Sequence, residues 1–260
     1  MNRIPVLLTF DLDGEIGTQM ANVYGEPGIR NPMVGRYGPK KGIFNILKLL
    51  KEERVKASFQ IVGKIAEMYP SVIHSIHNDG HELAIHSYTH RDYQTLTYQE
   101  IDGEIKKTKY IIQSLTGIES IGHRSPFWRT SQHIKDLLVK NNLLWNSDAH
   151  TVFEKKDFIT PYKLINNIIE IPSSDRTDDW TCLLIRKLPL NKVSKLWLNE
   201  LLMSYQHQTP CTLVMHPFIT GKIKNLPLLK SIINIVKNNS EKYFFIRPKD
   251  YLESLTINNS

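Results

Sequence analysis

The sequence predicts one α/β domain that contains a parallel sheet or barrel. Short apolar runs, typical of buried strands, alternate along the chain with segments of helical periodicity, as in successive β-α units. The chain has 260 residues, a length that α/β barrels reach as a single unit. It contains no repeat, linker or low-complexity segment, so we predict that residues 1–260 form a single domain.

The first predicted strand is 5–11, a nearly continuous apolar run of the kind that is buried on both faces of a parallel sheet. Thr97 and Glu100 form a capping box that predicts the start of a helix running through Leu115. Further strands are predicted at 57–62, 83–85, 120–121, 143–146, 168–172, 211–215 and 244–246, and further helices at 43–53, 63–68 and 71–78.

Residues 15–41 are predicted to form a long loop, because this segment is rich in glycine and proline. A loop of this length in a compact domain is usually functional. It follows directly on Asp11 and Asp13, so we expect it to cover a site next to these carboxylates.

Composition narrows the classes of function. The net charge is +7 and the isoelectric point is about 9.2, but lysine and arginine are scattered with no run longer than a pair. This pattern favours a solvated basic surface over nucleic-acid binding. The chain has only two cysteines, far apart and in apolar surroundings, so we expect neither a disulfide framework nor a cysteine metal site.

The N-terminal apolar run predicts neither a secretion signal nor a membrane span. Asp11 interrupts it after a few residues, and no small-residue cleavage site follows. With the low cysteine content, this predicts a cytoplasmic protein.

Polar residues follow several predicted strands, and these positions suggest a common site. The carboxyl ends of parallel strands meet at one edge of a sheet, where α/β folds place their chemistry. A buried sheet has little other use for charge there. The residues in these positions are Asp11, Asp13, His86, His90, Arg124, Asp148 and His216.

His86 and His90 are four residues apart, so both imidazoles can face one point. Alone, this pair is a weak signal, because surface helices carry such pairs by accident. Two imidazoles supply half of a zinc-type site, which usually needs a third protein ligand and an open position for water.

Four motifs resemble those of the polysaccharide deacetylase family, carbohydrate esterase family 4. They are Thr9-Phe10-Asp11-Leu12-Asp13-Gly14-Glu15, His86-Ser87-Tyr88-Thr89-His90, Arg124-Ser125-Pro126-Phe127 and Leu213-Val214-Met215-His216-Pro217, and the match extends from about residue 4 to about 250. Most members have two adjacent aspartates in the first motif, whereas here Leu12 separates them. This form looks more like an allantoinase-like and peptidoglycan-deacetylase-like intracellular branch, often tetrameric.

The resemblance implies a distorted (β/α) barrel of about seven strands and a role for each motif residue. Asp13, His86 and His90 would be the metal ligands. Asp11 would be the general base, with Arg124 keeping it ionised, and His216 would be the general acid that protonates the leaving amine. Zinc is the default metal for such a ligand set, with cobalt, nickel and manganese as alternatives.

Other residues near these motifs are candidates for substrate binding. Trp128 and Trp180 can stack on a sugar face or pack in the core, and Asp148 can orient His216 or Arg124 or be structural. The full candidate set is Pro126, Phe127, Trp128, Asp148, Asp179 and Trp180.

The leading hypothesis is a metal-dependent hydrolase that removes an N-acetyl or similar acyl group from an amino sugar. The sugar can be free, polymeric, nucleotide-linked or lipid-linked, and the basic surface suits a phosphorylated form. The alternatives are an allantoinase-like hydrolase of cyclic imidates or small amides, and a carbohydrate-binding barrel without catalysis. Loops over a barrel mouth often become subunit contacts, so a homo-oligomer is compatible with the sequence.

Overall fold

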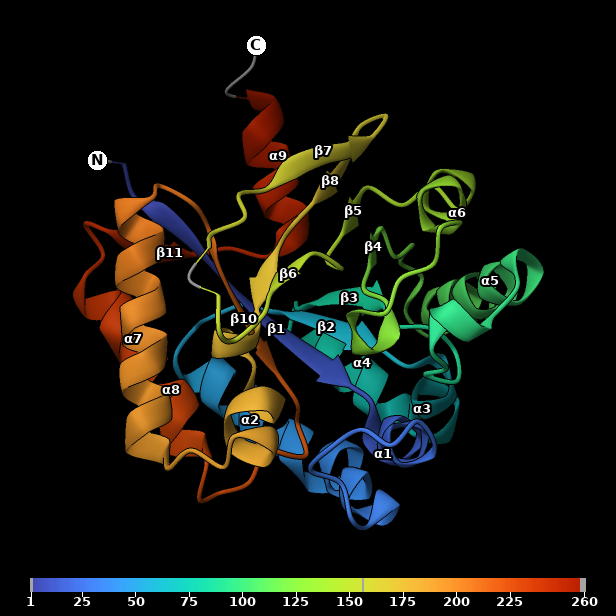
Figure 1. Ribbon diagram of the computed structural model, residues 1–260, viewed down its shortest axis with the longest axis horizontal. Helices are drawn as coiled ribbons and strands as arrows, with labels where there is room; N and C mark the ends of the chain where they lie inside the picture. The colour runs from blue at the N-terminus through green and yellow to red at the C-terminus, as the bar shows by residue number, and fades with distance from the viewer. Residues whose placement is uncertain (1, 156, 258–260) are drawn as a thin grey trace.

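The computed structural model describes residues 2–155 and 157–257, and its centre is a curled, mostly parallel sheet surrounded by helices (Figure 1). The sheet order is β10-β1-β2-β3-β4-β5-β8-β7, β11 also pairs with β1, and β6 and β9 form a separate pair. The strands are β1 (Ile4–Leu12), β2 (Ser58–Ile61), β3 (Glu82–Ile85), β4 (Gly122–His123), β5 (Trp145–Asn146), β6 (His150–Thr151), β7 (Tyr162–Ile165), β8 (Ile168–Glu170), β9 (Ser173–Ser174), β10 (Cys211–Met215) and β11 (Tyr243–Phe245).

The edge of the sheet at β10 is contacted by the chain that follows the separate β6–β9 pair. The segment after β9 approaches β10 through a parallel bridge between Asp178 and Val214. The Thr177 hydroxyl also donates a hydrogen bond to the Thr212 carbonyl at 2.7 Å. The predicted parallel barrel is therefore confirmed as a curled sheet, although β7 pairs with β8 in the antiparallel direction, which we did not predict.

Helices cover the outside of the sheet, as the alternating sequence pattern predicts (Figure 1). The Thr97 capping box is formed, and Gly117 ends its helix in the left-handed conformation. The helices are α1 (Gly14–Val23), α2 (Ile43–Glu52), α3 (Gly63–Met68), α4 (Pro70–Asn78), α5 (Tyr98–Thr116), α6 (Ile134–Lys140), α7 (Leu190–Gln206), α8 (Leu226–Asn238) and α9 (Pro248–Ile257), with short 3₁₀ or π segments at Pro32–Arg36, Gly38–Gly42, Tyr93–Thr95, Pro126–Trp128, Asp175–Thr177 and Trp180–Ile185.

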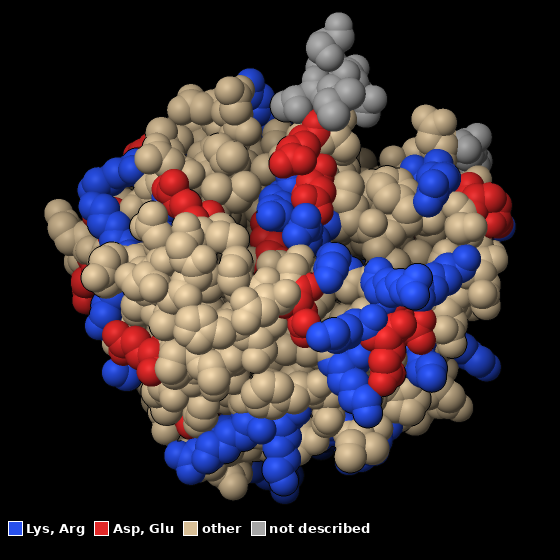
Figure 2. All heavy atoms as spheres, turned by 180° about the vertical axis from the view of Figure 1, so that it is seen from behind, with Lys and Arg blue, Asp and Glu red and all other residues tan. Residues whose placement is uncertain are grey.

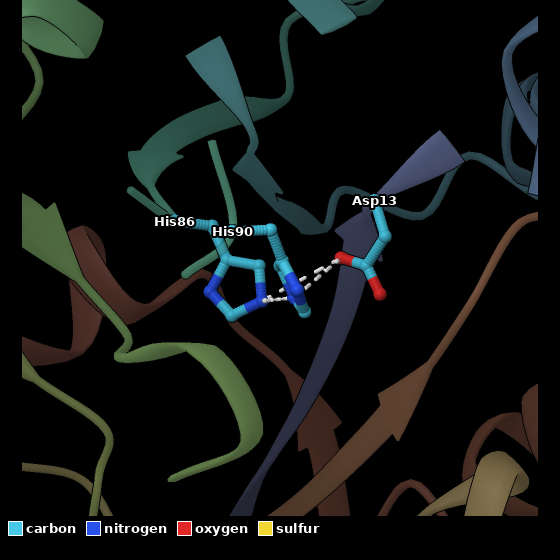
Figure 3. A group of neighbouring side chains, drawn as sticks. All are labelled: Asp13, His86 and His90. Carbon is cyan, nitrogen blue, oxygen red and sulfur yellow. Dashed lines mark hydrogen bonds and ion pairs between the residues drawn. The ribbon is translucent and has the colours of Figure 1, made fainter. Parts of the chain in front are cut away.

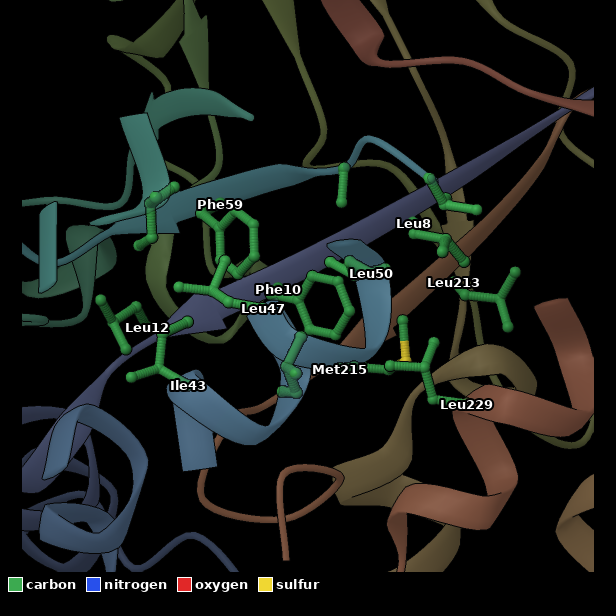
Figure 4. Packing of buried hydrophobic residues seen from close by; sticks show 14 of the residues in the cluster. Leu8, Phe10, Leu12, Ile43, Leu47, Leu50, Phe59, Leu213, Met215 and Leu229 are labelled. Atoms are coloured by element: carbon green, nitrogen blue, oxygen red, sulfur yellow. The ribbon is translucent and has the colours of Figure 1, made fainter. Parts of the chain in front are cut away.

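The largest apolar cluster packs one face of β1, β2 and β10 against helices including α2 and α8 (Figure 4). Phe10 and Phe59 stack with ring centroids 5.0 Å apart, and both are fully buried. Such packing makes the central strands rigid, because interiors are close-packed and resist displacement. Residues at the ends of these strands therefore have well-defined positions.

The prediction that 15–41 is a long loop is wrong. The segment contains α1, which starts directly after β1, followed by two short helical turns. Its glycines allow close packing: a β-carbon on Gly35 would lie 2.0 Å from the Gly14 carbonyl oxygen. Glycine content here thus reflects contact between two backbone segments instead of an extended loop.

Two further observations concern the helices and the surface. Among the described residues, no helix is long and apolar enough to cross a membrane. On the face in Figure 2, lysine and arginine occur in several groups, and carboxylates lie beside some of them.

Four strands end directly before residues that the sequence singles out. β1 is followed by Asp13, β3 by His86, β4 by Arg124 and β10 by His216. These strands are neighbours in the order β10-β1-β2-β3-β4, with only β2 between them, so their carboxyl ends lie at one edge of the sheet.

Candidate active site

A cavity of about 200 Å³ opens at this edge of the sheet. This volume is below the roughly 300–1,000 Å³ typical of sites for drug-sized ligands, which favours a small group over a long buried chain. The residues that line it are Asp11, Asp13, Glu26, His86, His90, Arg124, Ser125, Phe127, Trp128, His150, Asp175, Asp178, Trp180, Thr181, Ile185 and His216.

Asp13, His86 and His90 converge in this cavity (Figure 3). The Asp13 Oδ1 atom lies 3.5 Å from His86 Nε2 and 3.6 Å from His90 Nε2. The two Nε2 atoms are 3.2 Å apart. His90 has a φ of 56°, a left-handed conformation that is uncommon outside glycine and that turns its imidazole back towards His86.

The donor atoms of these three residues fit a cation. His86 Nδ1 lies 2.8 Å from the Arg124 carbonyl oxygen, which can only accept, so Nδ1 carries the proton and Nε2 presents a lone pair. Asp13 Oδ1 is buried and has no hydrogen-bond donor among the described residues. Lone pairs that face one another in a buried site repel unless a cation lies between them.

The protonation states of the three residues agree with this fit. Burial lowers the pKa of His86 to about 4 and that of His90 well below its usual range, so both imidazoles are neutral at pH 7. Burial raises the pKa of Asp13 to about 8, although His216 opposes the shift. Asp13 therefore needs a cation beside it to be fully ionised at neutral pH.

A second cluster, Asp178, Asp179 and His216, has its oxygens occupied by protein donors. Asp179 Oδ1 lies 2.7 Å from His216 Nδ1, and Asp179 Oδ2 accepts from the backbone of His216 and from Thr220. Asp178 accepts from Trp180 and Thr181. The two carboxylates of this cluster therefore orient the His216 imidazole and favour its protonated form. The cluster fits a metal less well than Asp13, His86 and His90 do.

His216 is held as a cation. Burial alone would lower its pKa, but the Asp179, Asp13 and Asp178 carboxylates together outweigh burial, with Asp179 the strongest of them, and raise the pKa of His216 to about 10. Its Nε2 atom lies 3.6 Å from Asp13 Oδ2, so the ring reaches the centre of the site. A protonated imidazole in this position can donate a proton.

Asp11 is held as an anion on the other side of the site. Although burial would raise its pKa, the Arg124 guanidinium, whose Nη1 lies 2.7 Å from Asp11 Oδ1, leaves the pKa of Asp11 below its usual value. Arg124 is 1% exposed and also donates to Thr9 and to Ser147, so its position is constrained. Asp11 Oδ2 lies 3.8 Å from His86 Nε2, beside the cation position.

Three predicted substrate-binding residues, Phe127, Trp128 and Trp180, line the cavity. Phe127 and Trp128 have φ values of 57° and 54°, and two consecutive left-handed residues other than glycine are costly and usually persist at functional sites. Trp128 stacks on His150 with centroids 4.9 Å apart.

The other three candidates lie outside the cavity lining. Pro126 is buried at the start of a 3₁₀ turn. Asp148 accepts two hydrogen bonds from Ser125, and Asp179 contacts His216 instead of open space. Asp148 thus contacts Ser125, the residue next to Arg124, and its role in orienting Arg124 or His216 stays a prediction.

The sequence analysis missed further lining residues. They come from turns and from the helical segment Trp180–Ile185, and none belongs to the four motifs, so the fold brings them to the cavity. These residues are Glu26, His150, Asp175, Asp178, Thr181 and Ile185.

Comparison with known proteins finds relatives of the chain and a family model that matches part of it. The family model described as polysaccharide deacetylase matches residues 37–143. A peptidoglycan deacetylase of Helicobacter pylori is 22% identical over 268 residues, covering 91% of both chains. A peptidoglycan-N-acetylglucosamine deacetylase of Bacillus cereus is 30% identical over 105 residues, which are 40% of this chain and 35% of the relative.

Solved structures share the fold. A Mycobacterium smegmatis structure matches 99% of this chain and 92% of its own with a TM-score of 0.85 and 23% identity. PuuE allantoinase matches 97% of this chain and 90% of its own with a TM-score of 0.81 and 20% identity. At these identities the matches establish the architecture alone.

Proposed function

We propose that this chain, which belongs to the polysaccharide deacetylase family, is a metal-dependent hydrolase that removes an N-acetyl or similar acyl group from an amino sugar. The observation that carries the proposal is the placement of Asp13, His86 and His90 around one point, with an anionic Asp11 on one side and a cationic His216 on the other. Hydrolysis of an amide needs a base for water, stabilisation of the oxyanion and a proton for nitrogen.

Asp13, His86 and His90 would hold the cation through Oδ1 and the two Nε2 atoms. When bound, the cation supplies activation of water and polarisation of the acyl carbonyl. Zinc suits one carboxylate and two imidazoles, and cobalt, nickel or manganese are alternatives.

Asp11 acts as the general base that takes the proton from the attacking water. A base must be ionised and fixed within reach of its target. The guanidinium of Arg124 supports both requirements, because it favours the charged form of Asp11 and binds the oxygen Oδ1, leaving Oδ2 facing the cavity.

His216 acts as the general acid. The leaving amine is a poor leaving group until it is protonated, and the Nε2 proton of the His216 cation faces the cavity. Asp179 holds Nδ1 and keeps the ring charged, so that Nε2 always has a proton to give.

The cavity lining favours an uncharged sugar over a phosphorylated one. Five carboxylates line the cavity, whereas its described lining includes no lysine, and its arginine is paired with Asp11. A phosphate near Glu26 or Asp175 would meet like charge. The aromatic rings of Phe127, Trp128 and Trp180 suit the apolar face of a sugar ring. The basic surface is therefore a weaker guide to the substrate than the cavity.

The test is elemental analysis of the purified protein together with acetate release from N-acetylglucosamine oligomers. We expect about one divalent metal per chain, loss of acetate release after chelation, and recovery with zinc or cobalt. Asp13→Ala should lose both metal and activity while remaining folded, whereas Glu26→Gln, a change in the lining away from the ligand set, should keep its metal.

Two results would overturn this function. A protein that carries no metal after incubation with zinc, cobalt, nickel or manganese contradicts the metal mechanism. Hydrolysis of a cyclic imidate such as allantoin, without acetate release from any amino sugar, favours the alternative activity. The cytoplasmic location and the homo-oligomeric state stay predictions.

A further inference from the structure

One residue, Arg124, contacts both a proposed metal ligand, His86, and the proposed general base, Asp11. Its carbonyl oxygen accepts the Nδ1 hydrogen of His86 at 2.8 Å, and its side chain donates to Asp11 at 2.7 Å. The backbone of Arg124 therefore orients a proposed metal ligand, while its guanidinium orients the proposed base. Any shift of this backbone would disturb both.

A carboxylate outside the cavity lining holds the neighbouring residue. Asp148 accepts the backbone N–H of Ser125 at 2.6 Å through Oδ1 and the Ser125 hydroxyl at 2.8 Å through Oδ2. Asp148 is 8% exposed. Two short, charge-assisted hydrogen bonds from one residue to one carboxylate leave little freedom for the adjoining peptide of Arg124.

Asp148 is itself fixed by a second buried carboxylate. Glu170 Oε1 accepts the backbone N–H groups of Asp148 at 2.6 Å and of Ala149 at 2.7 Å, and Oε2 accepts from the Asn146 amide at 2.7 Å. Glu170 is 1% exposed. A continuous set of hydrogen bonds thus leads from Glu170 through Asp148 to the Arg124–Ser125 segment.

This arrangement is costly for folding, which argues against a purely structural role. Burial raises the pKa of Glu170 to about 7, and the charge of Asp148 adds to the shift because two carboxylates lie close together. Neutral side chains could accept the same backbone hydrogens without this repulsion. Buried carboxylates with perturbed pKa values of this kind cluster at functional sites.

We propose that Asp148, held by Glu170, is the positioning residue that sets His86 and Asp11 at once through the backbone of Arg124 and Ser125. The proposal rests on the proposed function, because it assigns Asp148 to the metal site and to the base. It predicts that one substitution outside the cavity lining lowers metal affinity and turnover together.

The experiment measures zinc affinity by competition with a chromophoric chelator, in parallel with kcat and KM for acetate release. Asp148→Ala should lower zinc affinity by about 10- to 100-fold, the usual effect of losing a partner behind a metal ligand. It should lower kcat by a similar factor and change KM little, because substrate contacts remain. Ser125→Ala removes only the hydroxyl contact and should give a smaller loss in the same two quantities.

Glu82→Ala is the matched control. Glu82 is also a buried carboxylate, 4% exposed, and accepts from Trp145 and the Lys249 backbone, but it lies at the start of β3, at the opposite end from His86. It should lower the melting temperature and leave zinc affinity unchanged. Asp148→Asn, which retains an acceptor for the Ser125 N–H group, should recover much of the zinc affinity lost in Asp148→Ala.

The outcomes separate this inference from the proposed function. Wild-type zinc affinity that persists in both Asp148→Ala and Ser125→Ala overturns the inference and leaves the deacetylase proposal intact. An equal loss of zinc affinity in Glu82→Ala also overturns it, because the effect would then follow stability. A wild type that binds none of zinc, cobalt, nickel and manganese overturns both.

Discussion

Replacing Asp179 with asparagine should turn His216 from a cation into a neutral imidazole at neutral pH. Burial lowers the pKa of His216, but Asp179, 2.7 Å from Nδ1, outweighs burial together with Asp13 and Asp178, and the result is a pKa of about 10. Asparagine has nearly the same shape and lacks the charge. His86 indicates the lower limit for the pKa of His216 in this variant, since burial lowers the pKa of the His86 imidazole to about 4.

The size of the effect follows from the protonated fraction of His216. In the variant we expect a pKa between about 4, as for His86, and about 6.5, the ordinary value. At pH 7.5 the protonated fraction then falls from nearly one to between roughly 0.0003 and 0.1. Since general acid catalysis contributes about 10²–10⁴-fold, kcat for an amide should fall by about 10- to 1,000-fold.

The pH dependence has a definite sign. The protonated imidazole is the active form, so the ratio of variant to wild-type kcat should rise as the pH is lowered from 9 towards 5. The assay compares acetate release from an N-acetylated sugar with hydrolysis of p-nitrophenyl acetate, whose leaving group needs no proton. The kcat for hydrolysis of the ester should be nearly the same in Asp179→Asn as in the wild type.

Asp178→Asn serves as the control, because Asp178 lies 3.8 Å from His216 Nδ1 and is bound mainly to Thr181. The loss of kcat for the amide should be several-fold smaller in Asp178→Asn than in Asp179→Asn. Equal losses for amide and ester in Asp179→Asn, or a ratio that does not change with pH, would refute the acid role of His216.

Two further predictions concern stability and specificity. Burial raises the pKa of Glu82 from 4.5 to about 7. The folded state therefore binds the proton more tightly than the unfolded state, and the contribution of Glu82 to stability should fall by about 3 kcal/mol as pH rises through this window. Glu82→Gln should flatten that dependence in urea unfolding at pH 5 and pH 8, and an unchanged slope contradicts the assignment. Asp175→Asn should raise kcat/KM for a phosphorylated N-acetylhexosamine about fivefold relative to the uncharged sugar. The reason is that one like charge at about 4 Å in water costs roughly 1 kcal/mol. An unchanged ratio of the two kcat/KM values would show that Asp175 does not discriminate against a phosphate.

Residues that follow a strand directly were predictable from the sequence. An apolar run identifies a buried strand, and the next polar residue lies at its end, as with Asp13 after β1 and His216 after β10. The strand order then brings together residues that are about 200 positions apart in the chain. The convergence of Asp13, His86 and His216 therefore required only the positions of strands, whereas that of His90 also depends on the turn after His86.

Residues that reach the cavity from turns were not predictable in this way. Glu26 follows α1, and His150 and Asp175 come from the irregular region around β6 and β9. Their positions depend on long-range contacts, such as the hydrogen bond from the Trp180 indole to the Pro27 carbonyl, that leave no periodic signal in the sequence. Glycine in 15–41 misled the prediction because close backbone packing and loop formation both select it.

The leucine between the two aspartates of the first motif is compatible with the proposed chemistry. Side chains alternate along a strand, so residues two apart point to the same face, and the one between points to the other. Leu12 is fully buried in the apolar cluster, whereas Asp11 and Asp13 both line the cavity. Asp11 lies near the end of β1 and Asp13 directly follows the strand as the N-cap of α1, so this junction presents two carboxylates, one beside the arginine and one beside the histidines. Because Leu12 anchors this end of β1, Leu12→Ala should disturb the site through packing, at a cost of about 2–5 kcal/mol in stability, without removing a ligand.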